Sequence, residues 1–431
     1  MLCIKTDLEK IVKNTAIRNA IIYSIGALFL RGISLYMLPI YTRLLTKVDY
    51  GMLDLLTTIT AVLSPVFCGG LPQVVFIYYF HTEGIEREKM IKQSIYTFFL
   101  YSTPILFITV LVSPFIASRI SSPETPVTAF PLLFMAIMPA FMGFAAQITY
   151  TILMNGQKAL FVSTMQIVTG LLMAILNIYG VVYLRMGYLA VIGSTFIVTL
   201  IETLFCIYLG LKYRRSSDFS FDYEKAKEYL MIGLPIVFGA LANWILISAD
   251  RWFLAYFRTM EELGLYAVSY KFGFVFQQLL IVPFMSAISP RLMSKFKDSL
   301  VDAVKYKSKI FLFYSILGIL AIVFFILILP FVYKIFVGKE FQSSIEFTLW
   351  ILFGFLFWGA AQLRTLYLIY LKKTKLVIFI TFIAAISNLI ACFILIPDYG
   401  PKGAAWATGI AYFVFMLVGM IYERIELNKT L

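Results

Sequence analysis

Residues 230–257 have the sequence LMIGLPIVFGALANWILISADRWFLAYF, which is apolar over more than the roughly 20 residues that a helix needs to cross a membrane. The run nevertheless contains Asp250 and Arg251. A charge in the middle of a membrane helix costs roughly 2.5 to 3.5 kcal/mol on insertion scales and usually faces a partner or a watery cavity. The stretch therefore predicts a membrane helix whose charged pair is a candidate functional site.

The rest of the chain repeats this pattern. Hydrophobic residues make up 61% of the 431 residues and charged residues only 14%, a composition that excludes a soluble globular domain. We expect an all-α polytopic membrane protein with about twelve membrane-spanning helices of about 20 residues or more. The predicted spans lie near residues 19–42, 52–80, 93–117, 128–153, 160–184, 189–211, 230–257, 263–289, 308–333, 345–371, 375–396 and 403–422.

Further charged side chains lie within these predicted spans. Arg31 is in the first, Asp54 in the second and Lys271 in the eighth, and Arg31 and Lys271 have no acidic neighbour within a helical turn. Asn243 precedes Asp250 by two helical turns and shares its side of the seventh span. These positions predict polar faces on otherwise apolar helices, where a substrate or an ion can be bound.

The Lys and Arg residues of the short loops predict the orientation in the membrane. With both termini on the cytoplasmic side, roughly three times as many Lys and Arg residues lie on that side as on the other. The formal net charge of +13 then forms mainly a cytoplasmic rim that faces anionic lipid headgroups. We expect membrane lipids as partners and no nucleic acid.

The loops exclude several classes of function. The longest, residues 212–229 and 291–307, contain neither histidine nor a Gly-rich phosphate loop, so an ATP-driven pump is excluded unless a partner supplies the motor. The single histidine, His81, lies at the end of a span and is better explained as an interfacial residue than as a proton relay. The four cysteines are too dispersed for a zinc site. We expect no enzyme, no catalytic residue, no bound metal and no resident cofactor.

The chain also repeats weakly at an offset of about 213 residues. Residues 49–53 (DYGML) correspond to residues 262–266 (ELGLY), and each segment lies next to two spans. Internal similarity of this kind is typical of transporters built from two bundles around a central site. We predict an N-terminal six-helix lobe over 1–211, a cytoplasmic linker over 212–229 and a C-terminal six-helix lobe over 230–431. The linker is either an amphipathic surface helix or a solvated loop.

Four phrases carry a resemblance to a known family. They are LPIYTRLLTKVDYG (residues 38–51), ISADRWFLAYF (247–257), ELGLYAVSYKFG (262–273) and YGPKGAAWAT (399–408). In their order and spacing the chain resembles the polysaccharide flippases, of the O-antigen and capsule type, of the multidrug/oligosaccharidyl-lipid/polysaccharide exporter superfamily. Lipid II flippases of that superfamily typically carry two further spans, and its drug exporters generally lack the DR and YKFG phrases.

The resemblance implies two six-helix lobes in a V around a central cavity lined by the first, second, seventh and eighth helices. It implies a flippase of the inner (cytoplasmic) membrane that moves a polyprenyl-diphosphate-linked oligosaccharide to the outer leaflet by alternating access. A diphosphate with about two negative charges favours fixed cations, and Arg31, Arg251 and Lys271 are the candidates. For Arg251 the alternative is that it pairs with Asp54 or Asp250 and holds helices together.

The energetics leave the driving force open. Moving about two negative charges out of a negative cytoplasm is favoured by about 4 to 5 kcal/mol per 100 mV, so the membrane potential alone is a sufficient source. If Na⁺ or H⁺ is coupled to transport, the candidate residues are Asp54, Asp250, Asn243, Asn388 and Thr408. We expect a monomer that works with polysaccharide polymerase machinery. The alternatives are a multidrug exporter of the same superfamily and a membrane polysaccharide polymerase, although the latter should show a large outer loop with catalytic acids.

Overall fold

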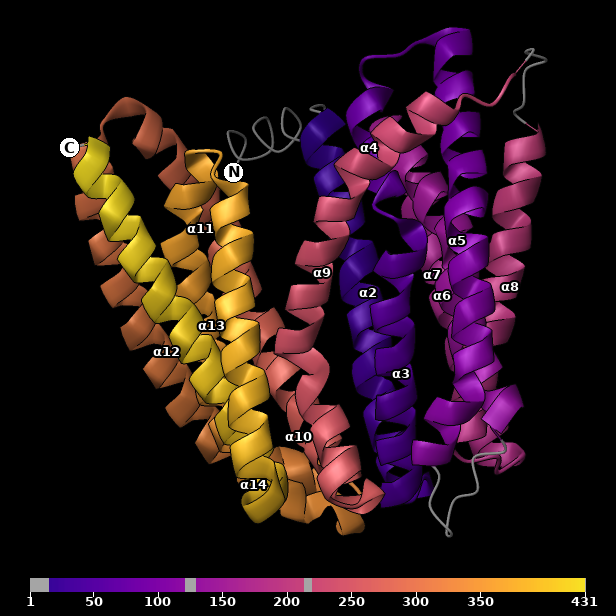
Figure 1. Cartoon of the computed structure of the whole chain (residues 1–431). Coiled ribbons are helices and arrows are strands. Elements are labelled where there is room, and N and C mark those ends of the chain that lie inside the picture. The colour runs from indigo at the N-terminus through magenta and orange to yellow at the C-terminus, as the bar shows by residue number, and fades with distance from the viewer. Residues whose placement is uncertain (1–14, 121–128, 213–218, 431) are drawn as a thin grey trace, which may run out of the picture. The chain divides into compact units, whose positions relative to one another are not determined.

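The computed structural model describes residues 15–120, 129–212 and 219–430, and every regular element within these ranges is a helix. Helices α2 to α14 follow one another through short connections, with a π-helical turn after α7 and another after α10 (Figure 1). Their bounds are α2 Thr15–Leu44, α3 Lys47–Cys68, α4 Leu71–Tyr79, α5 Gly84–Ile120, α6 Ala129–Asn155, α7 Ala159–Ile178, η1 Tyr179–Tyr183, α8 Tyr188–Lys212, α9 Tyr223–Phe257, α10 Met260–Phe276, η2 Gln277–Ile281, α11 Val282–Asp298, α12 Leu300–Phe336, η3 Lys339–Ser344, α13 Ile345–Tyr370 and α14 Thr374–Thr430.

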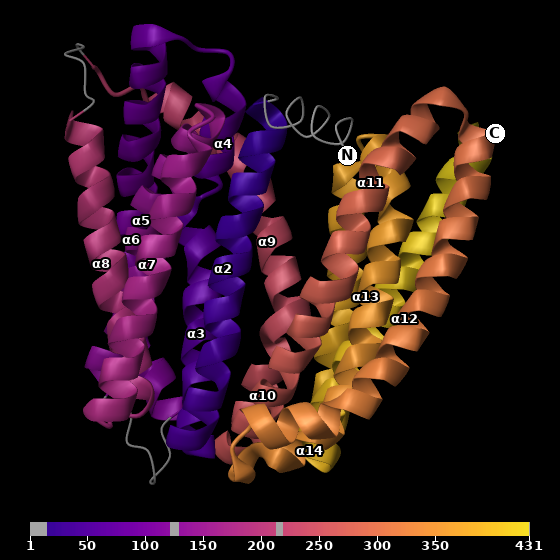
Figure 2. The ribbon, with the colours of Figure 1, turned by 180° about the vertical axis from the view of Figure 1, so that it is seen from behind.

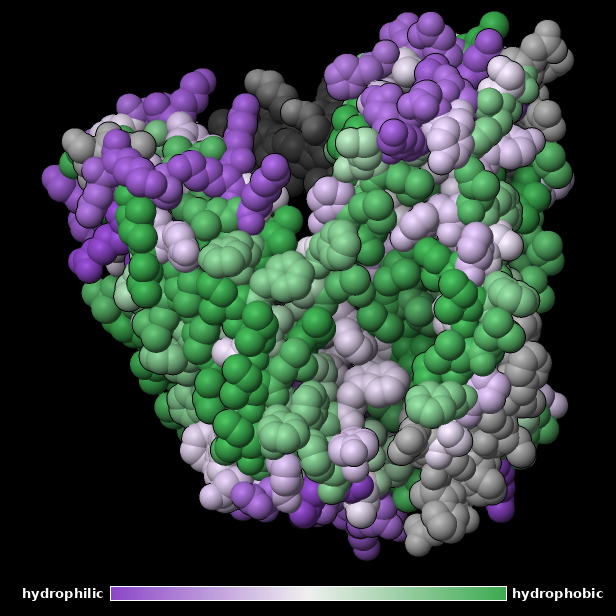
Figure 3. Space-filling model, in the orientation of Figure 1, coloured by the Kyte–Doolittle hydropathy of each residue, from purple (hydrophilic) through white to green (hydrophobic). Residues whose placement is uncertain are grey.

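Eleven helices of the described residues are long and apolar enough to cross a membrane. The last of them, α14, contains the predicted eleventh and twelfth spans, which are joined by a kink at Gly400 with a positive φ of 54°. On the face drawn in Figure 3, hydrophobic side chains cover the middle of the surface and hydrophilic side chains gather toward its two ends. Large apolar side chains such as Phe107, Leu327 and Phe331 are more than 60% exposed, as contact with lipid requires. The chain is a multi-pass membrane protein.

The predicted span over residues 52–80 is divided in the structure. Gly69 and Gly70 have positive φ values of 56° and 70°, a conformation that glycine adopts at little cost, and they separate α3 from the short helix α4. Gly70 also lies so close to the backbone of Gly233 that a Cβ atom on it would be 2.4 Å from the Gly233 carbonyl oxygen. The break therefore lets α4 approach α9 at backbone distance.

The helices form two compact units, and the first contains residues 1–44 and 56–238. Within it, α6 packs against α4, α5, α7 and α8, while α2 packs against α7 (Figure 2). Aromatic side chains fill the space between α5 and α6, where the rings of Phe98 and Phe144 stack with their centroids 3.8 Å apart. Between α2 and α7, the hydroxyl of Ser163 donates to the carbonyl of Ile22 at 3.3 Å. Aromatic rings thus join α5 to α6, and a small polar side chain joins α2 to α7.

The second unit contains residues 45–55 and 239–431. Helix α13 is its centre and packs against α10, α11, α12 and α14. One part of the core surrounds Tyr314 and Tyr367, both 1% exposed, and the Tyr314 hydroxyl donates to the Leu356 carbonyl at 2.9 Å. The side chain of Tyr314 thus satisfies its polar atom while its ring is buried.

The unit boundary differs from the division at residues 212–229 that was expected from the sequence. Helix α9 changes units between Phe238 and Gly239, and the first turns of α3 belong to the second unit. A Cβ on Gly51 would lie 2.2 Å from the Met260 carbonyl oxygen, so α3 and α10 touch through their backbones. Packing thus links the first turns of α3 to helices about 200 residues away in the chain.

The linker is only partly described, since residues 213–218 lie outside the described ranges. Residues 219–222 are not helical, whereas residues 223–229 form the first turns of α9. The ring of Phe219 stacks on Tyr96 at 5.3 Å, and the side-chain amide of Gln93 donates to the Asp222 carbonyl at 2.5 Å. These contacts hold residues 219–222 against α5.

Candidate functional site

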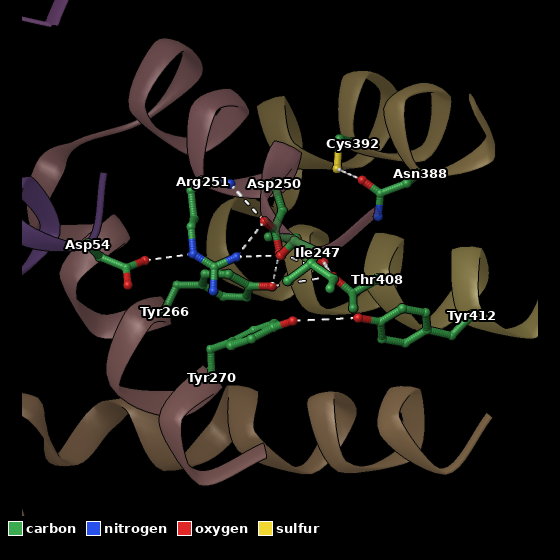
Figure 4. A network of polar contacts seen from close by, with 11 residues as sticks. Asp54, Ile247, Asp250, Arg251, Tyr266, Tyr270, Asn388, Cys392, Thr408 and Tyr412 are labelled. Atoms are coloured by element: carbon green, nitrogen blue, oxygen red, sulfur yellow. Dashed lines mark hydrogen bonds and ion pairs between the residues drawn. The ribbon is translucent and has the colours of Figure 1, made fainter. Parts of the chain in front are cut away.

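A buried polar network lies in the second unit, where α9 and α10 meet the second half of α14 and the first turns of α3 (Figure 4). Its centre is Asp250, which is 1% exposed, and the neighbouring Arg251 is 5% exposed. An uncompensated buried charge is costly, so such a pair persists only when its hydrogen bonds are satisfied. The contacts of both side chains meet this requirement.

Each oxygen of the Asp250 carboxylate accepts two hydrogen bonds. Oδ1 accepts from the backbone N–H of Arg251 and from its Nη1, each at 2.9 Å. Oδ2 accepts from the hydroxyl of Tyr266 and from that of Thr408, the latter at 3.2 Å. A carboxylate has about four lone-pair positions, so the Asp250 side chain is fully satisfied.

The Arg251 guanidinium joins two helices. Its Nε donates to Oδ2 of Asp54 at 2.7 Å, which links α9 to α3, while Nη1 donates to the Ile247 carbonyl at 2.7 Å as well as to Asp250. The guanidinium carbon lies 4.1 Å from the centroid of the Tyr270 ring, a cation–π distance. Arg251 therefore contacts both acids that the sequence offered as its partners.

The network continues toward α14. The hydroxyls of Tyr270 and Tyr412 are 3.5 Å apart, and the Ala404 carbonyl, 3.1 Å from the Thr408 hydroxyl, is a second acceptor within reach of its single proton. Asn388 is 1% exposed, and its Oδ1 accepts from the Cys392 thiol at 3.5 Å. Its Nδ2 has no partner among the described residues.

The structure thus brings together part of the predicted set. Asp54, Asp250, Arg251 and Thr408 are in direct contact, and Asn388 lies at the edge of the same region (Figure 4). Asn243 is exposed on α9 and makes no hydrogen bond with these residues. No group of His, Cys, Asp and Glu side chains within the described ranges is arranged to hold a metal ion.

Arg31 and Lys271, by contrast, are exposed. Arg31 belongs to α2 in the first unit and Lys271 to α10 in the second, and neither forms an ion pair with a residue of the described ranges. Both lie inside candidate membrane spans. Each of the two units therefore presents an exposed cation within a candidate membrane span.

Three tyrosines of the network, Tyr266, Tyr270 and Tyr412, were not predicted from the sequence. A signal was present, because Tyr266 and Tyr270 are four residues apart and so lie on one side of α10. In a membrane helix, however, tyrosine is also common at the lipid interface, so this spacing alone does not indicate a buried hydrogen bond.

A second buried ion cluster joins α12, α13 and α14. The Lys307 ammonium pairs with Oε1 of Glu423, and Nη1 of Arg364 lies 3.5 Å from Oε2 of the same carboxylate. The side chains of Lys307 and Glu423 are 4% and 6% exposed. The guanidinium of Arg364 also lies 3.9 Å from the centroid of the Phe311 ring.

We predict that Glu423→Gln destabilises the protein by about 3 to 5 kcal/mol, because it leaves the ammonium of Lys307 buried without a counter-charge. Thermal melting of the purified protein measures this loss. The matched control is Glu346→Gln, which removes an exposed pair with Lys402 and should cost at most about 1 kcal/mol. If both variants melt alike, the cluster does not stabilise the fold.

Comparisons with known proteins agree with this architecture. A family model described as "Polysaccharide biosynthesis protein" matches residues 40–346. No curated protein matches the chain. Among solved structures, the inward closed conformation of the lipid II flippase MurJ is similar with a TM-score of 0.71 and 20% identity, over 94% of this chain and 90% of that one.

An inward-facing multidrug resistance MATE family transporter of the MOP superfamily is similar with a TM-score of 0.72 and 15% identity, over 92% of this chain and 95% of that one. A MOP superfamily transporter from Pyrococcus furiosus gives a TM-score of 0.55 and 13% identity, over 96% and 93% of the two chains. At these identities the similarity establishes the fold alone. The fold is that of the transporters of this superfamily.

Proposed function

Because the chain belongs to the family of polysaccharide biosynthesis proteins, we propose that it is a flippase for a polyprenyl-diphosphate-linked oligosaccharide. It moves the lipid-linked sugar from the cytoplasmic to the outer leaflet of the inner membrane by alternating access. The product then supplies a polymerase that builds a surface polysaccharide of the O-antigen or capsule type. The chain itself acts as a transporter rather than as an enzyme.

The observation that carries the proposal is the exposure of Arg31 and Lys271 within membrane spans. A cation in a span is costly unless it serves an anionic ligand or a partner, and these two have no carboxylate partner in the described part of the chain. A diphosphate offers that ligand, since arginine binds it through a planar fork and lysine as a point charge. Arg251 is less suited to this role because two carboxylates already engage its guanidinium.

The same two cations disfavour the multidrug alternative for cationic drugs, because like charges repel in a medium of low dielectric constant. The membrane potential supplies the driving force in this proposal. About two negative charges leaving a negative cytoplasm gain about 4 to 5 kcal/mol per 100 mV.

The proposal is tested by reconstituting the purified chain in vesicles that contain a fluorescent polyprenyl-diphosphate oligosaccharide. Exposure of the sugar on the outer leaflet, detected with a membrane-impermeant quencher, should rise only in vesicles with protein and should accelerate when a potential is imposed. Protein-free vesicles give the background. Transport of a cationic dye without any movement of the lipid-linked sugar would favour the multidrug exporter instead.

The orientation of the chain gives a separate prediction. We expect residues 372–375 and both termini on the cytoplasmic side and the loop before α13 on the opposite side, because the cytoplasmic loops are rich in Lys and Arg. Cysteines introduced at Lys375 and Lys339, both exposed, should react with an impermeant thiol reagent from opposite sides of the membrane. Labelling of both from one side would contradict this topology.

A further inference from the structure

We propose that Arg251 is a built-in cation that takes the place of a coupling ion at Asp250. This inference deepens the proposed function, because it concerns how that transport is energised. It also answers the alternative that the sequence left open, in which Na⁺ binds near Asp250.

The oxygens around the guanidinium form a set that a hard cation would use. Arg251 donates to Oδ2 of Asp54 at 2.7 Å, to Oδ1 of Asp250 at 2.9 Å and to the carbonyl of Ile247 at 2.7 Å. Carboxylate and carbonyl oxygens are the ligands that hard metal cations take in proteins. The guanidinium therefore already occupies the position in which the three oxygens converge.

The Asp250 carboxylate leaves no room for a further cation. Its second oxygen accepts from the hydroxyls of Tyr266 and Thr408, so each of its oxygens has two donors. A sodium ion on Asp250 would have to displace Arg251 or both hydroxyls. The residues present thus do not fit Na⁺ binding at Asp250 as they stand.

Several contacts also keep the Arg251 guanidinium in this position. Asp54 anchors its Nε from α3, the Tyr270 ring covers it at 4.1 Å, and the residue is 5% exposed. Removing one member of a buried ion pair leaves an uncompensated charge and costs several kcal/mol. The two carboxylates and the guanidinium together carry one net negative charge, and the side chain of Asp54 is 14% exposed.

Wild-type protein should bind no sodium at this site, whereas Arg251→Gln should create a sodium site, because it withdraws the guanidinium from the oxygens of Asp54, Asp250 and Ile247 while keeping a polar side chain. Asn388 and Thr408 contribute further oxygens in the same region (Figure 4).

The experiment is thermal melting of the purified full chain in NaCl and in choline chloride at equal ionic strength. We expect the wild type to melt at the same temperature in both salts and Arg251→Gln to be stabilised by NaCl in a saturable way. Binding at about 100 times the dissociation constant would contribute about 2.7 kcal/mol. Adding Asp250→Asn to Arg251→Gln should abolish the effect of sodium. Arg258→Gln is the matched control, because Arg258, the residue after α9, pairs with Glu262 and donates to the Pro397 carbonyl away from Asp250, and its replacement should give no sodium effect.

A saturable, sodium-specific stabilisation of the wild type would overturn the inference, and so would an Arg251→Gln protein that folds but ignores sodium. Should that variant not insert into the membrane, radioactive sodium binding to the wild type decides, since binding at one site per chain refutes the built-in cation. None of these measurements uses the lipid substrate. A failure of the inference is therefore distinguishable from a failure of the proposed flippase activity.

Discussion

Lys271→Ala is expected to reduce export of the lipid-linked oligosaccharide by about tenfold or more while leaving membrane insertion normal. Hydrogen bonds to a charged group contribute about 1.5 to 3 kcal/mol, and a difference of about 1.4 kcal/mol corresponds to a factor of ten. Removing a cation from a span lowers the cost of insertion, so a loss of export cannot be explained by poor insertion. Arg31→Ala is expected to have an effect of the same size for the same reason.

The measurement is complementation of a flippase-deficient strain together with the vesicle assay, at expression levels matched by immunoblot. Lys339→Ala is the control. Lys339 is an exposed lysine of η3 and is not a candidate substrate ligand, so its replacement should leave export unchanged. Arg31→Lys separates two mechanisms: partial activity indicates that charge alone matters, and a complete loss indicates that the bidentate fork does. Full complementation by the double alanine variant would show that the two cations do not bind substrate.

The second large effect is expected at the backbone contact between α3 and α10. Gly51→Ala should destabilise the second unit by about 3 kcal/mol, because the new Cβ would lie 2.2 Å from the Met260 carbonyl oxygen. Gly264→Ala should do the same, since its Cβ would lie 2.0 Å from the Lys47 carbonyl oxygen. Backbone atoms cannot rotate away as a flexible side chain does, so the two helices must separate.

Thermal melting and resistance to proteolysis measure this loss. The controls are Gly143→Ala and Gly193→Ala, which add a Cβ in open space within α6 and α8 and should be neutral or slightly stabilising because alanine favours the helix. If Gly51→Ala has the same melting temperature as these controls, the close approach of α3 to α10 does not stabilise the unit.

The contacts of Gly51 and Gly264 also correspond to the internal repeat of the sequence. Gly51 and Gly264 are separated by the offset of about 213 residues found in the sequence, and so are Lys47 and Met260, whose carbonyls they face. The equivalent positions of the two repeats therefore contact each other in a reciprocal way. The weak similarity of DYGML and ELGLY thus coincides with the closest approach of α3 to α10.

The membrane class, the spans and the repeat could be predicted from the sequence because they depend on local properties. The cost of placing an apolar or a charged side chain in lipid is approximately a sum over residues, so runs such as 230–257 indicate helices without knowledge of their neighbours. The four family phrases are likewise continuous segments. The same reasoning located Asp54, Asp250 and Arg251 as unusual, since each charge is surrounded by apolar residues in the chain itself.

Only the tertiary structure decided how these charges are used. Arg251 and Asp54 are 197 residues apart, and Asp250 and Thr408 are 158 apart. Packing of α3, α9, α10 and α14 brings them to hydrogen-bonding distance, and no local property of the chain indicates that Asp54 and Thr408 meet the adjacent pair Asp250 and Arg251. The sequence offered Arg31, Arg251 and Lys271 together as ligands of a diphosphate and left open whether Arg251 pairs with Asp54 or Asp250. The fold buries Arg251 between these two acids and leaves Arg31 and Lys271 exposed, because packing brings carboxylates only to Arg251.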